Sequence, residues 1–79
     1  EYWVYILWSD KLGRYYIGST SNIQRRLRDH NSGRSGYTRR GVPWKLIYQE
    51  ACVTKKEAWL RERQIKKYKS GEQFKKLIT

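Results

Sequence analysis

The sequence predicts a small α/β (α+β) domain: a three-stranded, mainly antiparallel sheet flanked by three helices, in the order β-β-α-β-α-α. Three observations lead to this expectation. Two β-rich runs open the chain, a third run with alternating apolar residues lies at 44–51, and helix-capping patterns precede the remaining segments. The 79 residues suit a single domain, 1–79, near the lower size limit of a self-supporting core.

The first two strands are expected to form a hairpin over 3–18. Residues 2–8 (YWVYILW) are aromatic or aliphatic at successive positions, which indicates a strand covered on both faces. The segment 9–13 (SDKLG) has turn residues, and 14–18 (RYYIG) returns as the second strand.

Each predicted helix begins at a hydroxyl residue followed three positions later by Glu or Gln, the capping-box pattern. The pairs are Ser21 with Gln24, Thr54 with Glu57, and Ser70 with Gln73, which predict helices over about 22–31, 54–68 and 71–77. Between the first two helices, 32–43 contains three glycines and a proline and is expected to be a loop. The third strand follows, with Trp44, Leu46 and Tyr48 alternating with Lys45, Ile47 and Gln49.

The charge distribution points to a polyanionic partner. Eighteen Lys and Arg against seven Asp and Glu give a net charge of +11. Residues 1–22 hold two groups of each sign, whereas 23–45 hold seven basic groups and one acidic group. Nucleic acid is the first candidate. A solubility surface or a lipid-facing patch is the alternative interpretation.

Other features narrow the class of protein. A single cysteine, Cys52, cannot form an intramolecular disulfide, which suits a reducing, cytoplasmic location, and one Cys with one His cannot form a metal cluster. No run is long enough to span a membrane, and none resembles a signal peptide. Because the sequence contains no Met, we expect the native start to precede Glu1, and the native end is equally open.

Helical geometry separates the basic residues of 22–31 into two groups. With about 100° per residue, His30 and Arg26 fall about 20° and 60° from Ile23, on the side expected to face the sheet. Arg25 and Arg28 fall on the far side, where contact with phosphate and a solvated face with Arg25 paired to Asp29 are both open interpretations. For Arg26 and His30, the alternative to a functional role is a structural ion pair or a snorkelling stem.

The 54–68 helix places one carboxylate inward. Ala58 and Ile65 mark its buried side, and Glu62 lies about 40° from Ala58. Glu57 already has a structural role in the cap. Glu62 has none, so a divalent cation would explain it, with an i,i+4 ion pair to Lys66 as the alternative.

Four segments in this order and spacing resemble the GIY-YIG endonuclease superfamily. They are WVYIL (3–7), YYIGST (15–20), NIQRRLRDHNSG (22–33) and EAWLRERQIKKY (57–68). The resemblance covers almost the whole chain and is strongest to the small stand-alone members, similar to the N-terminal domain of the excision-repair incision subunit. The first half-motif departs from the family in opening with Trp3 where the family has glycine.

The resemblance implies a set of catalytic residues, namely Tyr5, Tyr16, Arg26, His30 and Glu62, with Glu62 as the metal ligand. It implies a metal-dependent DNA endonuclease that hydrolyses phosphodiester bonds with one Mg²⁺ or Mn²⁺, in DNA repair or nucleic-acid processing. A lone carboxylate predicts a weakly bound metal in the absence of substrate. In such a site nearby cations would lower the high pKa of a tyrosine base.

The expected partner is single-stranded or structured DNA, bound by a monomer and without a membrane, with a protein partner as a possible source of specificity. Candidate contacts outside the catalytic set are Arg25 and Arg28, and the loop residues Tyr37, Thr38, Arg39 and Arg40, which could instead be plain surface. Two other functions stay open: a non-catalytic nucleic-acid-binding module of the same fold, and a basic scaffold or ribosome-associated domain.

Overall fold

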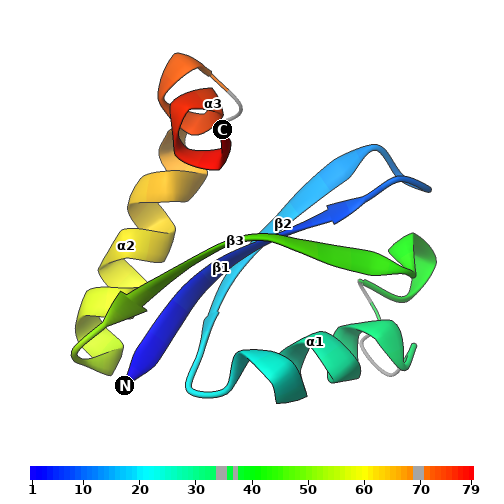
Figure 1. Ribbon diagram of the computed structural model, residues 1–79, viewed down its shortest axis with the longest axis horizontal. Helices are drawn as coiled ribbons and strands as arrows, with labels where there is room; N and C mark the ends of the chain where they lie inside the picture. Colours follow the sequence, from blue (N-terminus) through cyan, green and yellow to red (C-terminus); the bar gives the residue numbers. More distant parts are fainter. Residues whose placement is uncertain (34–35, 37, 69–70) are drawn as a thin grey trace.

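The computed structural model describes residues 1–33, 36, 38–68 and 71–79, and it has the predicted element order. Helices lie on both faces of one sheet, α1 on one side and α2 with α3 on the other (Figure 1). The elements are β1 (Tyr2–Ser9), β2 (Arg14–Thr20), α1 (Ile23–Asn31), the 3₁₀ helix η1 (Thr38–Gly41), β3 (Trp44–Cys52), α2 (Lys55–Tyr68) and α3 (Glu72–Ile78).

The sheet has the order β2-β1-β3, and both pairings are antiparallel. Because β1 is central and helices cover both faces, its alternate residues enter two different cores. Val4 and Ile6 point toward α2 and α3, whereas Tyr5 and Leu7 point toward α1. The prediction that the first strand is covered on both faces is therefore confirmed.

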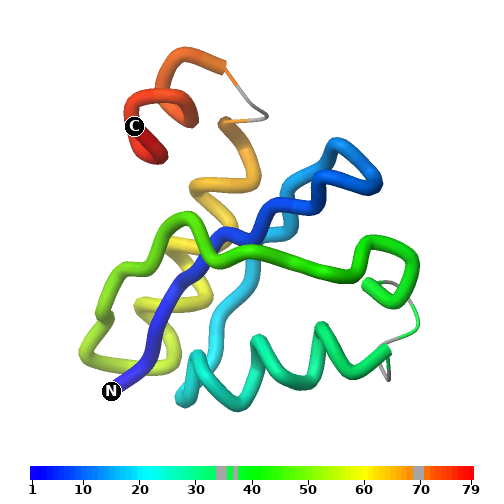
Figure 2. The backbone as a smooth tube through the Cα atoms, turned by 45° about the vertical axis from the view of Figure 1, so that its right-hand side comes forward, coloured from blue at the N-terminus to red at the C-terminus, as the bar shows by residue number. Residues whose placement is uncertain are grey.

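The two cores divide the fold into a supporting half and a half that holds polar residues. The first is apolar and joins the sheet to α2 and α3 through Val4, Ile6, Ala58, Ile65 and Phe74. The second lies under α1 and contains Tyr5, Leu7 and Trp44, with Tyr16, Ile23 and Leu27 packed around them. The helix α3 lies at the far end of α2, away from α1, so it belongs to the supporting half (Figure 2).

The third strand contains an irregularity that the alternating sequence pattern did not reveal. Its pairing with β1 shifts register, because Ile6 is opposite Tyr48 but Leu7 is opposite Leu46. The extra residue, Ile47, makes this a bulge. Leu46 therefore packs in the core under α1, whereas Tyr48 packs in the core under α2. The alternation of exposed and less exposed residues was predicted correctly, but the partly buried Leu46 and Tyr48 face opposite sides of the sheet.

Two helix boundaries differ from the expectation. The N-cap of α1 is Asn22 rather than Ser21, since the Asn22 side chain accepts a 3.0 Å hydrogen bond from the Arg25 backbone N–H. Both residue types cap helices well, and the chain begins the helix one residue later.

The expected loop 32–43 contains η1, which buries Thr38 and Gly41. The Ser70 cap lies outside the described residues, and the N-cap of α3 is Gly71.

The cap of α2 is as predicted. The Thr54 hydroxyl accepts a 3.1 Å bond from the Glu57 backbone N–H, and a Glu57 carboxylate oxygen accepts one of 3.1 Å from the backbone N–H of Val53. Glu57 thus has the structural role that the sequence suggested.

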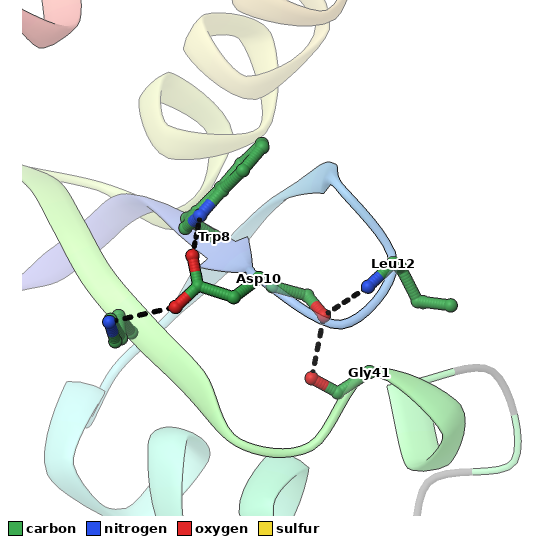
Figure 3. A network of polar contacts seen from close by, with 6 residues as sticks. Trp8, Asp10, Leu12 and Gly41 are labelled. Atoms are coloured by element: carbon green, nitrogen blue, oxygen red, sulfur yellow. Dashed lines mark hydrogen bonds and ion pairs between the residues drawn. The ribbon is translucent and has the colours of Figure 1, made fainter.

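Polar contacts join the β1–β2 turn to η1 and β3 (Figure 3). The buried Ser9 hydroxyl donates a 2.7 Å bond to the Gly41 carbonyl and accepts one of 3.1 Å from the Leu12 N–H. Asp10 accepts from the Trp8 indole N–H at 2.6 Å and forms a 2.9 Å ion pair with Lys45. The 3₁₀ segment is thereby fixed against the sheet, which matters because it also supports the site described next.

Candidate active site

The ring of Tyr5 lies across the neighbouring strand at a glycine. Tyr5 is opposite Gly18 in the β1–β2 register. A Cβ atom at position 18 would lie 2.6 Å from the Tyr5 hydroxyl oxygen and 2.8 Å from its Cζ, closer than non-bonded atoms approach. Only glycine therefore lets the phenol pass over β2 toward the edge of the sheet.

A buried chain of hydrogen bonds fixes the Tyr5 hydroxyl. Its oxygen lies 3.1 Å from Nε2 of His30, and Nδ1 of the same imidazole lies 2.9 Å from the Thr38 hydroxyl. The Thr38 carbonyl accepts a 2.7 Å bond from the indole N–H of Trp44. Thr38 is 0% exposed. It was expected to contact DNA, but burial in η1 makes it a positioning residue for His30 instead.

Both motif tyrosines surround the imidazole. The Tyr16 ring packs edge-on against His30 with centroids 4.7 Å apart, and it lies 6.3 Å from the Tyr5 ring. Tyr16 is partly exposed, whereas Tyr5 and His30 are buried. The predicted Tyr5, Tyr16 and His30 thus lie together on the α1 side of the sheet.

Arg26 extends this cluster from α1, as helix geometry predicted. Its guanidinium interacts with the Tyr5 phenol, and this interaction raises the pKa of Arg26. Burial raises the pKa of Tyr5 to about 12, and it outweighs the opposing effect of Arg26. The expected direction of the cation effect is confirmed for Arg26, but burial outweighs it, so the net pKa of this tyrosine is raised. The phenol is protonated at neutral pH and needs further positive charge to act as a base.

His30 is held neutral. Burial lowers the pKa of its imidazole below the ordinary value of 6.5, and the charge of Arg26 lowers it further. A neutral imidazole carries one N–H, so it can accept the Tyr5 proton at Nε2 while donating from Nδ1 to Thr38, or take the opposite tautomer. Either arrangement satisfies both contacts.

Glu62 on α2 contacts β2 from the face of the sheet opposite to Tyr5. One carboxylate oxygen accepts a 2.8 Å bond from the Ser19 hydroxyl, and the other lies 2.6 Å from Nζ of Lys66. Ser19 is next to Gly18 on β2, so it points away from Tyr5 and toward α2. The Glu62 side chain is only 17% exposed. Its negative charge still acts on the Tyr5 phenol, where it favours the protonated form and contributes to the raised pKa.

The donors available for a metal are few. Within the described part of the chain, no three His, Cys, Asp or Glu side chains come together to hold an ion. Glu62 is a hard oxygen ligand beside a bound cation, the Lys66 ammonium. One carboxylate fits Mg²⁺ or Mn²⁺ when substrate phosphate and water complete the coordination, because Mg²⁺ commonly uses one or two carboxylates together with phosphates.

The predicted contacts outside this cluster lie in three places. Arg25 is exposed and lines a shallow pocket beside Arg26 at the start of α1, and Arg28 is exposed on the same helix. No ion pair joins Arg25 to Asp29, both of which are described. Arg39 and Arg40 are exposed and line a second pocket with Arg14, a residue not predicted, together with Leu12 and Gly36. Tyr37 lies outside the described residues.

Sequence reasoning missed three supporting residues. Ser19 positions Glu62, and only the strand pairing reveals that it points toward α2. The Trp44 indole donates to the Thr38 carbonyl. The Asn31 side chain in turn fixes the Trp44 backbone: its oxygen accepts a 2.6 Å bond from the N–H, and its amide nitrogen donates a 3.2 Å bond to the carbonyl. Asn31 is the last residue of the predicted helix, and an amide side chain at a helix end was the one sequence feature that could have indicated this contact.

Comparison with known proteins places this geometry in a family. The GIY-YIG catalytic domain matches residues 1–75. A UPF0213 protein of Staphylococcus haemolyticus is 36% identical over 76 residues, which cover 95% of this chain and 92% of that protein. One of Streptococcus pneumoniae is 47% identical over 58 residues, covering 72% of this chain and 59% of the relative. The aligned region thus spans less than two thirds of the pneumococcal relatives.

A solved structure agrees with the fold. The solution NMR structure of a UPF0213 protein from Bacillus halodurans is 33% identical, has a TM-score of 0.60, and is matched over 98% of this chain and 81% of that one. The names of these relatives state no activity. No helix in the described residues is long and apolar enough to cross a membrane.

Proposed function

Because the chain belongs to the GIY-YIG catalytic domain family, we propose that it is a metal-dependent endonuclease that hydrolyses phosphodiester bonds in DNA. One observation carries the proposal. Tyr5, Arg26 and His30 from one face of the sheet and Glu62 from the other converge on the edge strand β2 around Gly18 and Ser19. A fold that served only for support would have no reason to bring a tyrosine, an arginine, a histidine and a carboxylate together around one glycine.

Each residue has a role that suits its surroundings. Arg26 supplies fixed positive charge and paired N–H donors to the non-bridging oxygens of the scissile phosphate. Tyr5 takes the proton of the attacking water while its own hydroxyl proton passes to Nε2 of neutral His30, to which it is hydrogen-bonded. Tyr16, packed on the imidazole and partly exposed, orients the water or the phosphate.

Glu62 would hold the metal, which neutralises phosphate charge and stabilises the leaving oxygen when bound. For that, the Lys66 ammonium has to leave one carboxylate oxygen, while the Ser19 hydroxyl keeps the other in place. Competition with Lys66 and the absence of a cluster of metal ligands among the described residues both favour weak metal affinity before substrate binds. Mg²⁺ and Mn²⁺ are the candidate ions, one per site.

Positive charge on exposed residues supports binding to the nucleic-acid backbone. Arg25 and Arg28 on α1, and Arg39 and Arg40 on η1, are all exposed. We propose that these residues contact phosphates on the two sides of the catalytic cluster. A role in DNA repair, a cytoplasmic location, a monomeric state and a protein partner that adds specificity are parts of the same proposal.

A non-catalytic binding module is the second candidate, and the ion pair between Glu62 and Lys66 favours it. In such a module, Glu62 would be a structural carboxylate and no metal would bind. The two candidates differ in a direct assay. The protein is incubated with labelled single-stranded, duplex, flap and junction DNA, with Mg²⁺ or Mn²⁺ and with EDTA. The proposal predicts cleavage that EDTA abolishes, and binding without cleavage of any substrate would favour the module.

A further inference from the structure

An exposed tryptophan lies beside the proposed catalytic carboxylate. All four tryptophans are within the described residues, and only Trp59 on α2 is exposed, at 50%. Trp3 and Trp8 are partly buried, and Trp44 is buried. A single exposed aromatic residue is common on protein surfaces, so the neighbours of Trp59 decide what it can bind.

The geometry of α2 places this ring on the catalytic side. Glu62 contacts β2 through Ser19, whereas Arg61, about 100° away on the helix, contacts β3 through Glu50. Trp59 lies about 60° from Glu62 in the other direction, and about 4.5 Å from it along the axis. Trp59 therefore lies about one turn before Glu62, on the side of α2 that is turned away from β3.

Basic residues surround the ring. Lys55 and Arg63 lie four positions before and after Trp59, about one turn away on each side, whereas Lys66 lies on the same face two turns beyond the ring, where it pairs with Glu62. The Arg63 guanidinium lies 4.8 Å from the centroid of the indole. We call Lys55, Trp59, Arg63 and Lys66 the Trp59 stripe. A stripe of one aromatic ring among cations is suited to a nucleotide, whose base stacks on the ring while its phosphate meets the charges.

We propose that Trp59 is a stacking site for an unpaired nucleobase next to the scissile phosphate, an inference that rests on the proposed nuclease function. A base within a duplex is already stacked on both faces and cannot reach the indole without being extruded. The Trp59 stripe therefore makes the protein select DNA with an unpaired nucleotide on the Glu62 side of the cut, such as a single strand, a flap or a junction.

An apolar protein partner is a weaker match. The other exposed apolar residue of this part of α2, Leu60, is 47% exposed but lies about 100° from Trp59, farther from the Glu62 side. The ring is thus bordered by Lys55 and Arg63 rather than by a continuous apolar patch.

The test measures binding in EDTA, so that it does not depend on cleavage. Fluorescence anisotropy gives the Kd of wild type, Trp59→Ala, Trp59→Phe and Leu60→Ala for a labelled single-stranded oligonucleotide and for the same sequence as a blunt duplex. Trp59→Ala should weaken single-strand binding about tenfold, and Trp59→Phe should retain most of the affinity because a phenyl ring still stacks. Leu60→Ala is the matched control and should bind as wild type does. None of the variants should change duplex binding appreciably.

The inference is overturned if Trp59→Ala leaves single-strand affinity unchanged, or if it weakens single-strand and duplex binding equally. Both results are separable from failure of the proposed function. Selective loss of single-strand binding in a protein that never cleaves DNA would support the stacking site and remove the nuclease proposal. Metal-dependent cleavage with no effect of Trp59→Ala on single-strand binding would support the nuclease proposal and remove the stacking site. Because Trp59 is exposed, the variants should unfold at the wild-type temperature.

Discussion

Replacing Gly18 with alanine should displace Tyr5 and so remove activity. The new Cβ would lie 2.6 Å from the Tyr5 hydroxyl oxygen and 2.8 Å from Cζ, and Tyr16 Cε1 would be 3.2 Å away. Non-bonded carbon contacts are most favourable at about 3.5–4.0 Å, so the phenol has to move by about 1 Å. The ring cannot yield easily, since Tyr5 is 2% exposed and hydrogen-bonded to His30.

Both stability and rate should respond to Gly18→Ala. Forcing a methyl group into a well-packed site costs about 1–3 kcal/mol of unfolding free energy. A displacement of about 1 Å in a catalytic group lowers the rate about a hundredfold. Urea unfolding measures the first effect, and single-turnover cleavage of labelled DNA in Mg²⁺ measures the second.

Gly13→Ala is the control for destabilisation alone. Gly13 has a φ of +63° and no atoms within 4 Å of the Cβ position, so alanine there strains only the backbone. We expect a cost of about 1 kcal/mol and a wild-type cleavage rate. A folded Gly18→Ala protein that cleaves as fast as Gly13→Ala would refute the idea that the Tyr5 ring must pass over residue 18.

Three further predictions follow from the site and the surface charge. Arg26→Ala should lower the cleavage rate about a hundredfold or more at unchanged fold, because donors to the transition state are lost, and a wild-type rate would remove Arg26 from the mechanism. Since the pKa of His30 is lowered in the folded protein, the unfolded chain binds more protons as the pH falls below 6.5, so stability should decline there. Urea unfolding at several pH values checks this, and His30→Gln should flatten the decline; an equal slope in both proteins would contradict it. DNA affinity should fall steeply between about 50 and 200 mM salt, as anisotropy would show, and a salt-independent affinity would argue against backbone contacts.

Several features of the fold could be predicted because one strong signal determined each. Residues 2–8 are all aromatic or aliphatic, which indicated a first strand covered on both faces. The bulge at Ile47 could not be predicted, because the alternating sequence continues through it and only the pairing with β1 shows the extra residue. Ser21 and Asn22 are adjacent capping residues, and local sequence does not decide between them.

The same distinction holds for the candidate site. Helix periodicity placed Arg26, His30 and Glu62 on the inward side, because a rotation of about 100° per residue determines which side chains share the face of the apolar residues. The contact of Thr38 with His30 could not be predicted, because Thr38 follows a glycine-rich segment and meets His30 only through tertiary packing. The raised pKa of Tyr5 was missed for a related reason, because its burial depends on α1 and β2 together.

The most direct test of the account compares two glutamates on α2. Glu62→Gln keeps the side-chain volume and an oxygen for Ser19 but removes the charge that would hold the metal. Glu57→Gln can still accept from the backbone N–H of Val53, and it should cost at most about 1 kcal/mol. Metal-dependent cleavage and DNA binding are measured for both variants and for wild type. The account predicts that Glu62→Gln binds DNA but does not cleave it, and that Glu57→Gln cleaves as wild type does; cleavage retained by Glu62→Gln and lost in Glu57→Gln would contradict it.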